Sequence, residues 1–213
     1  MLHVEYVPSA LNPADSLSRG VADHSDWRLD RTAFHRASEW LRWWPSIDLF
    51  ASPINAQCRQ FVTRYPHPRA VASDPLRISW DNLPPAWANP PWKLLPHVVD
   101  KLASSDLSAI AVAFPLWASL PTRWLLAHAD RVTIWQPQRR LFREKGLRVR
   151  LAPQWPLCIA RIRPQQRPSF KRCCLMLDWD QSSRASIQAF NSLISRLSLS
   201  ETFSVSCIRR VRL

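Results

Sequence analysis

Ala109-Ile110-Ala111-Val112-Ala113-Phe114-Pro115 is an unbroken apolar run. A run of this length with branched and aromatic residues is typical of a strand buried on both faces, and such strands occur in parallel sheets covered by helices. Strand-like and helix-like segments alternate around it: strands at residues 47–50, 131–135 and 156–162, and helices at 92–104 and 121–128. This alternation predicts an α/β domain with three layers and a mostly parallel sheet.

A further helix is predicted over Asp26 to Trp44. Its apolar residues recur at helical spacing: Phe34, Ala37, Leu41 and Trp44. Asp30 or Thr32 would cap its N-terminus, and Pro45 would end it before the first strand. We expect this helix to pack beside the sheet.

A stiff corner, Asn89-Pro90-Pro91-Trp92, lies between a predicted strand end and the helix at 92–104. Two prolines fix φ near about −65° and lack N–H donors, which leaves carbonyl groups free to accept hydrogen bonds from a ligand. The exocyclic amine of a nucleobase is such a ligand, and acceptors at Asn89 and Pro90 would bind its hydrogens as its nitrogen attacks. Trp92 would stack on an extruded base. The alternative is that a chain with 19 Pro and 12 Trp contains this string by composition.

Other motifs precede this corner in a definite order: Asp48-Leu49-Phe50-Ala51, Asn55-Ala56-Gln57-Cys58, Phe61-Val62-Thr63, and Asp74-Pro75-Leu76 followed by Trp80. Together with the corner they resemble the phage-type DNA adenine methyltransferase family, which has Asn-Pro-Pro-Tyr at the corner. Beyond the corner the match continues through 109–115, Trp124 and Arg139-Arg140-Leu141-Phe142, so it spans about Ile47 to Arg163.

The resemblance implies a Rossmann-like methyltransferase fold, S-adenosylmethionine as cofactor, and methylation of the exocyclic amine of adenine in DNA. It assigns the base site to the corner: Asn89, Pro90, Pro91 and Trp92. It assigns the cofactor site to upstream motif residues: Asp48, Ala51, Asn55 and Asp74. Asp48 and Asn89 would both lie at the carboxyl ends of strands, where sheets of this class bind ligands.

A second resemblance lies in residues 3–19. The segment Asn12-Pro13-Ala14-Asp15 looks like the C-terminal end of the ribonuclease H domain of retroelement polyproteins, in which the Asp binds metal. A two-metal nuclease needs several carboxylates, so we interpret Asp15 as a relic, in the role of a loop residue or a helix N-cap. The two resemblances together imply a fragment of a DIRS-type retrotransposon polyprotein, and the rest of that polyprotein would be a partner.

Composition agrees with one principal domain plus attachments. Of 213 residues, 46% are hydrophobic, which is enough for a core. No apolar run approaches the ~20 residues of a membrane span, and the N-terminus lacks the layout of a signal peptide. We therefore expect no membrane partner and an intracellular protein, in the nucleus or cytoplasm. The five cysteines are odd in number and lack paired C-x-x-C spacing, which favours reduced thiols and no metal site.

The net charge of +13 is concentrated in one region. Basic residues crowd a predicted hairpin that turns at Lys145-Gly146: Arg139, Arg140, Arg143, Lys145, Arg148 and Arg150. Such a patch attracts phosphate backbones through counterion release. We predict that it binds DNA, as duplex, single strand or RNA–DNA hybrid; the alternative is a solvated basic face.

These patterns divide the chain into three parts. Residues 1–25 are interpreted as a ribonuclease H remnant or linker, 26–163 as the methyltransferase-like domain, and 164–213 as a basic linker with an amphipathic helix at 182–199. Two alternatives to an active enzyme stay open. The domain could be a degenerate, non-catalytic nucleic-acid-binding module, since the loop after the first strand contains Ser52-Pro53 and no glycine, or a structural segment of the polyprotein.

Overall fold

The structure, a computed structural model, describes residues 27–135, 141–144, 147–148, 155–165, 174–178 and 209–211, with positions 192 and 195. The predictions for residues 1–25 lie outside this part of the chain. Those for the amphipathic helix at 182–199 lie outside it as well, apart from the helical positions 192 and 195.

The described strands form one large sheet in the order β12-β11-β7-β10-β6-β5-β2-β3-β4. In chain order their bounds are β2 Ile47–Asp48, β3 Gln60–Thr63, β4 Ala72–Ser73, β5 Ala86–Ala88, β6 Ile110–Pro115, β7 Ala129–Trp135, β10 Leu157–Ile162, β11 Cys174–Asp178 and β12 Arg209–Val211. Within this sheet, β10 pairs antiparallel with both β6 and β7, whereas every other pairing of neighbours is parallel. The predicted mostly parallel sheet is confirmed.

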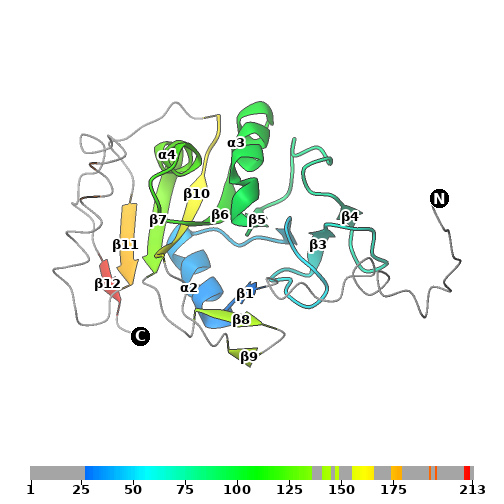
Figure 1. The fold of residues 1–213 in the computed structure, drawn as a ribbon, viewed down its shortest axis with the longest axis horizontal. Coiled ribbons are helices and arrows are strands. Elements are labelled where there is room, and N and C mark those ends of the chain that lie inside the picture. Colours follow the sequence, from blue (N-terminus) through cyan, green and yellow to red (C-terminus); the bar gives the residue numbers. More distant parts are fainter. Residues whose placement is uncertain are drawn as a thin grey trace, which may run out of the picture.

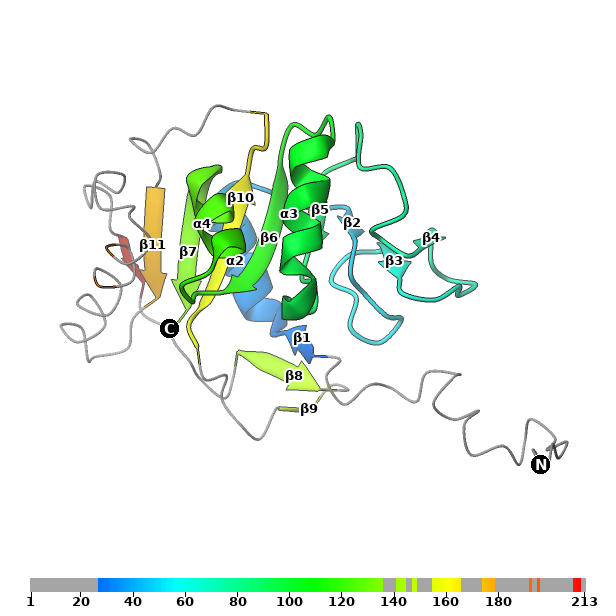
Figure 2. The same cartoon turned by 45° about the horizontal axis from the view of Figure 1, so that its top comes forward.

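Helices cover both faces of this sheet, as Figures 1 and 2 show. On one face lies α2 (Arg31–Leu41), and on the other lie α3 (Leu95–Ser104), preceded by the short helix η2 (Trp92–Leu94), and α4 (Leu120–Ala127). Two buried clusters follow this division, one containing the apolar residues of α3 and α4 and the other those of α2. The chain therefore has the predicted three-layer, Rossmann-like fold.

The apolar run at 109–115 forms the central strand β6. All six residues of β6 are buried, with successive side chains entering the two clusters: Val112 and Phe114 on the α3 side, Ala111 and Ala113 on the α2 side. Full burial of a side chain such as Val or Phe contributes about 1.5–3 kcal/mol relative to exposure. This two-sided burial explains why the run lacks the alternation of a half-exposed strand.

The helix predicted over 26–44 is shorter than expected. It begins at Arg31, where the Asp30 carboxylate caps it by accepting the Thr32 N–H at 3.0 Å. It ends at Leu41, because Arg42 adopts a left-handed conformation (φ 47°) that closes the last turn before Pro45 is reached. The residues before it form a strand, β1 (Trp27–Leu29).

A small second sheet contains β1, β8 (Phe142–Glu144) and β9 (Leu147–Arg148), all antiparallel. The pairing of β8 with β9 confirms the hairpin predicted around Lys145-Gly146. In Figures 1 and 2 this small sheet lies at the edge of the large sheet toward which the arrows of β6 and β7 point. That edge is the carboxyl-end edge of the parallel strands.

The described part of the chain holds no helix that is both long and apolar enough to cross a membrane.

Candidate functional site

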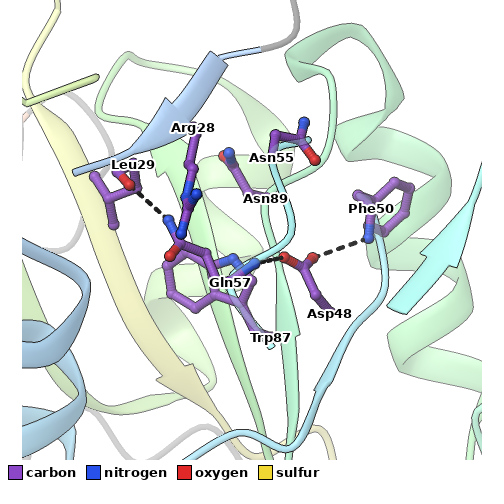
Figure 3. A pocket seen from close by; sticks show the side chains of 8 residues that line it. All are labelled: Arg28, Leu29, Asp48, Phe50, Asn55, Gln57, Trp87 and Asn89. Atoms are coloured by element: carbon purple, nitrogen blue, oxygen red, sulfur yellow. Dashed lines mark hydrogen bonds between the residues drawn. The ribbon is translucent and has the colours of Figure 1, made fainter. Parts of the chain in front are cut away.

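A solvent-open depression lies at the carboxyl ends of the adjacent parallel strands β2 and β5. Figure 3 shows its lining residues: Arg28, Leu29, Asp48, Phe50, Asn55, Gln57, Trp87 and Asn89. Its empty space is about 180 Å³. Four of the lining residues, Asp48, Asn55, Gln57 and Asn89, carry oxygen acceptors on their side chains, so the depression is mainly polar.

Asp48 ends β2 and fixes the loop that follows. It is paired in register with Trp87 of β5, and the next residue, Leu49, donates its N–H to the Trp87 carbonyl at 2.9 Å. The Asp48 side chain is 2% exposed, and its two carboxylate oxygens accept the backbone N–H groups of Phe50 at 3.3 Å and Gln57 at 3.0 Å. A buried carboxylate thus holds the loop over residues 49–57 against the sheet.

Asn89 follows β5 on the neighbouring wall and is half-buried. Its side-chain amide makes no hydrogen bond to any other group in the described ranges. The Pro90 carbonyl likewise accepts none from the described residues. Neither of the two acceptors proposed from the sequence is therefore engaged by the described residues, but only Asn89 lines the depression.

Gln57 and Arg28 complete the wall nearest the small sheet. The Gln57 amide nitrogen donates to the Leu29 carbonyl at 2.6 Å, which ties the loop after β2 to β1. Its amide oxygen is buried and has no hydrogen-bond partner among the described residues. In the small sheet, Arg28 is opposite Arg143, and Arg143 is opposite Arg148. Directly opposite positions share a face, so three arginine positions form one row that begins at the depression.

The structure brings together only some of the residues assigned from the sequence. Asp48, Asn55 and Asn89 line one depression. Ala51, Asp74, Pro90, Pro91 and Trp92 are not among the described residues that line it. Ala51 is buried and donates its N–H to the Val62 carbonyl at 3.1 Å, which ties the loop after β2 to β3.

Asp74 organises a turn beyond the edge strand β4. It has a φ of 55°, and its carboxylate accepts the Leu76 N–H at 3.2 Å and lies 3.6 Å from the Arg77 guanidinium. Because β3 and β4 separate this turn from β2 by two strand positions, Asp74 acts locally in the described structure.

The rest of the corner turns away from Asn89 into η2. Pro90 is buried, and Pro91 is exposed and accepts the Leu94 N–H at 2.8 Å. Trp92 is half-buried and contacts two other indoles, Trp117 and Trp155, with 5.5 Å between ring centroids in each case.

The basic residues of the predicted patch are only partly described. Arg139, Arg140, Lys145 and Arg150 lie outside the described residues, while Arg143 and Arg148 lie in β8 and β9. Arg143 therefore lies on the strand that pairs with β1, and Arg148 lies on the strand next to it.

Sequence reasoning missed Arg28, Leu29 and Trp87 as lining residues, and gave Phe50 and Gln57 no role. Arg28 and Leu29 belong to a three-residue strand that was assigned to the following helix. The available signals were the positions of Phe50 and Gln57 inside the Asp48–Ala51 and Asn-Ala-x-Cys motifs.

Cys58, the next residue, is an inert thiol in this environment. Burial, together with the nearby negative charge of Asp48, raises the pKa of the Cys58 thiol from its usual 9.0 to about 12. Its sulfur donates to the Pro45 carbonyl at 3.5 Å. In the described ranges no group of three or more His, Cys, Asp or Glu side chains could hold a metal ion.

Two histidines lie in or next to the helices α3 and α4. His97 is exposed on α3. His128 follows α4 and stacks on Trp124, with ring centroids 4.0 Å apart. Neither lines the depression between β2 and β5.

Comparison with known proteins gives a likeness in structure. No protein-family model matches the chain, and no curated protein matches it. Among solved structures, the chain is similar to the 23S rRNA methyltransferase ErmE, with 16% identity, a TM-score of 0.40, and coverage of 79% of this chain and 77% of that one.

Proposed function

We propose that this chain binds S-adenosylmethionine and methylates the exocyclic amine of adenine in DNA. The observation that carries the proposal is a pair of acceptors without partners among the described residues, the Asn89 amide and the Pro90 carbonyl. Asn89 lines the same depression as the buried Asp48, at the carboxyl ends of two adjacent parallel strands, and Pro90 follows it in the chain. The family resemblance of the motifs around these residues supports the same assignment.

The chemistry follows from the two acceptors. The exocyclic amine of adenine is a poor nucleophile because its lone pair is delocalised into the ring. The Asn89 amide oxygen and the Pro90 carbonyl would bind its two hydrogens and favour the pyramidal nitrogen that develops during attack. The Pro90 carbonyl belongs to the stiff Pro90-Pro91 backbone, so it needs little reorganisation.

We assign the cofactor site to the end of β2 and the loop that follows it. Asp48 at the end of β2 and Asn55 in the loop after it would hold the cofactor, which supplies an activated methyl group when bound. The empty space of about 180 Å³ extends into open solvent, so the depression is shallow. Most of the cofactor would therefore lie on the open surface.

Calorimetry with S-adenosylmethionine on the purified chain is the first test. Transfer of labelled methyl groups to adenine-containing DNA, with matched RNA and a DNA that lacks adenine as controls, is the second. Binding and transfer to adenine-containing DNA alone would support the proposal. Binding without transfer to any of these substrates would overturn it.

A degenerate, non-catalytic nucleic-acid-binding module is the second candidate. The small depression favours it, as does the loop after β2, where Ser52-Pro53 occupies the position at which a glycine would let backbone approach a cofactor. For this candidate, DNA binds and calorimetry gives no heat with S-adenosylmethionine. The cofactor titration thus separates the two functions.

The wider context is a proposal that rests on the resemblance of residues 3–19. On that reading the domain works within a DIRS-type retroelement polyprotein, in the nucleus or cytoplasm, and its partners are the other domains of that polyprotein. Copurification of a longer polyprotein with this domain would test it.

A further inference from the structure

Three tryptophans from separate parts of the chain meet at the carboxyl-end edge of the sheet. Trp92 begins η2 after β5, Trp117 follows β6, and Trp155 precedes β10. Because β10 runs antiparallel to β6, its start lies at the same edge as the end of β6, and the Leu116 N–H donates to the Pro156 carbonyl at 2.8 Å. These three tryptophans are called the indole cluster below.

The rings of the indole cluster pack edge to face. Their centroids are 5.5, 5.5 and 5.1 Å apart, with interplanar angles of 89°, 82° and 89°. An edge-to-face contact covers one face of only one of its two rings. Three such contacts therefore cover at most three of the six ring faces, and Trp92 also packs against the hydrophobic core.

The indole cluster differs from the tryptophans of the core. Trp80, Trp87 and Trp135 are at most 2% exposed, whereas Trp155 is 39% exposed and Trp92 and Trp117 are half-buried. Leu120, which begins α4 three residues after Trp117, is 80% exposed. Partly exposed aromatic rings that gather at one edge of a sheet mark a candidate interaction site.

We propose that the indole cluster stacks the unpaired bases next to the target base, so that the substrate is a single strand or a locally opened duplex. The inference rests on the proposed function, since it names the state of that function's substrate. Each nucleobase offers a π-face that stacks on aromatic rings, and base pairing within a duplex hides these faces. The net charge of +13 and the exposed Lys93 beside Trp92 favour a phosphate-bearing occupant over an apolar peptide.

Fluorescence anisotropy tests the inference with three labelled probes: a short oligodeoxyadenylate, the same strand with abasic sugars around a single adenine, and the matching duplex. Wild-type protein should bind the first probe tightest. Loss of stacking weakens binding by roughly fivefold to a hundredfold for each base. The double variant Trp117→Leu, Trp155→Leu should lose this factor on the first probe and bind the abasic strand as wild type does.

A matched control is Trp44→Leu. Trp44 is 58% exposed and precedes β2, so it lies at the opposite, amino-end edge of the sheet. The Trp44→Leu variant should bind all three probes with the affinity of wild type. The variant Trp155→Phe keeps an aromatic face and should retain most of the preference, while circular dichroism confirms folding of every variant.

Two results would overturn the inference: equal wild-type affinity for the base-bearing and abasic strands, or a leucine variant that keeps the preference. The proposed function fails separately. A protein that shows the stacking preference but neither binds S-adenosylmethionine nor transfers a methyl group refutes the enzyme and retains the indole cluster. Methyl transfer that is unaffected by the leucine variant retains the enzyme and refutes base stacking by the indole cluster.

Discussion

The Asp48 carboxylate accepts the backbone N–H of Gln57 at 3.0 Å, although the two residues are nine positions apart in sequence. Gln57 in turn donates its side-chain amide to Leu29 at 2.6 Å. Through these bonds the end of β2 fixes the loop that lines the depression and joins it to the small sheet. The loop is shaped by the buried carboxylate, in a stretch of chain that contains no glycine.

We expect Asp48→Asn to destabilise this loop, because one N–H acceptor becomes an amide donor. Hydrogen bonds to charged groups contribute about 1.5–3 kcal/mol each, so the free energy of unfolding should fall by an amount in this range. Urea unfolding measures the loss, and calorimetry should show weaker binding of S-adenosylmethionine. Asp100→Asn, at an exposed position of α3, is the control and should change neither quantity.

Asn89→Ala should lower kcat of methyl transfer while leaving DNA affinity nearly unchanged. The missing acceptor acts on the transition state, and by analogy with oxyanion donors its removal costs ~2.7–4 kcal/mol, or roughly a hundredfold to a thousandfold in rate. Single-turnover transfer of labelled methyl groups measures this effect.

Asn82→Gly is the control for that substitution, because Asn82 lies in an exposed turn with a φ of 53° that glycine adopts readily. Its rate should equal that of wild type. A normal rate for Asn89→Ala would remove Asn89 from the catalytic site.

The sequence predicted the main sheet and its helices well and the site only in part. The run at 109–115 and the helical spacing of α3 and α4 carry strong periodic signals, because each element buries whole faces. The three-residue strand β1 has no room for a period, so Arg28 and Leu29 could not be placed at the depression. Asp74 follows a strand, but chain order does not reveal that β4 is the edge strand, two positions from β2.

Cys58 should resist alkylation in the native protein. Burial, and then the charge of Asp48, raise the pKa of its thiol to about 12 from 9.0. The thiolate is the reactive form, and its fraction changes tenfold per pH unit, so labelling by iodoacetamide at pH 8 should be roughly a thousandfold slower than in the unfolded chain. Mass spectrometry of the peptide that contains Cys58 gives both rates.

The same pKa makes the free energy of unfolding depend on pH. Because the folded state holds this proton more tightly, the associated stability is complete below about pH 9 and is lost as the pH rises toward 12. Equal labelling of native and urea-unfolded protein at pH 8 would show that the thiol is accessible and ionised.

Asp130→Asn should weaken the contact between β7 and β10. The Asp130 carboxylate accepts both Arg161, at 2.8 Å from Nε and 2.5 Å from Nη2, and Arg163, at 2.6 Å from Nε. Burial alone raises the pKa of Asp130, but the hydrogen bonds and charges of the two arginines outweigh it and hold the pKa below its usual value.

Since that pKa is depressed in the folded state, the stabilisation is present at neutral pH and is lost as the pH falls through the folded pKa. Thermal unfolding at pH 7 should therefore show a lower Tm for Asp130→Asn than for wild type, and the difference should shrink at acidic pH. If the Tm difference between Asp130→Asn and wild type did not change with pH, the ion pairs would contribute nothing to stability.

The row of arginine positions Arg28, Arg143 and Arg148 should bind phosphates beside the depression. Directly opposite like charges in a sheet are destabilising unless an anion neutralises them, and nucleic-acid phosphates are such anions. Replacing all three with Gln should weaken DNA binding nearly equally across unrelated sequences. The slope of log affinity against log salt should become shallower by ~0.9 for each duplex phosphate that the variant no longer neutralises, or by ~0.7 on a single strand.

A control with the same reduction in charge separates local phosphate binding from net charge. Arg42, Arg59 and Lys101 lie at the amino-end edge of the sheet, because they follow α2, precede β3 and end α3 respectively. Replacing these three with Gln lowers the net charge equally and should leave the salt slope nearly unchanged. Equal slopes for the two triple variants would mean that the arginine row serves only overall charge, and nucleic-acid recognition would then rest on the Asn89 corner and the indole cluster.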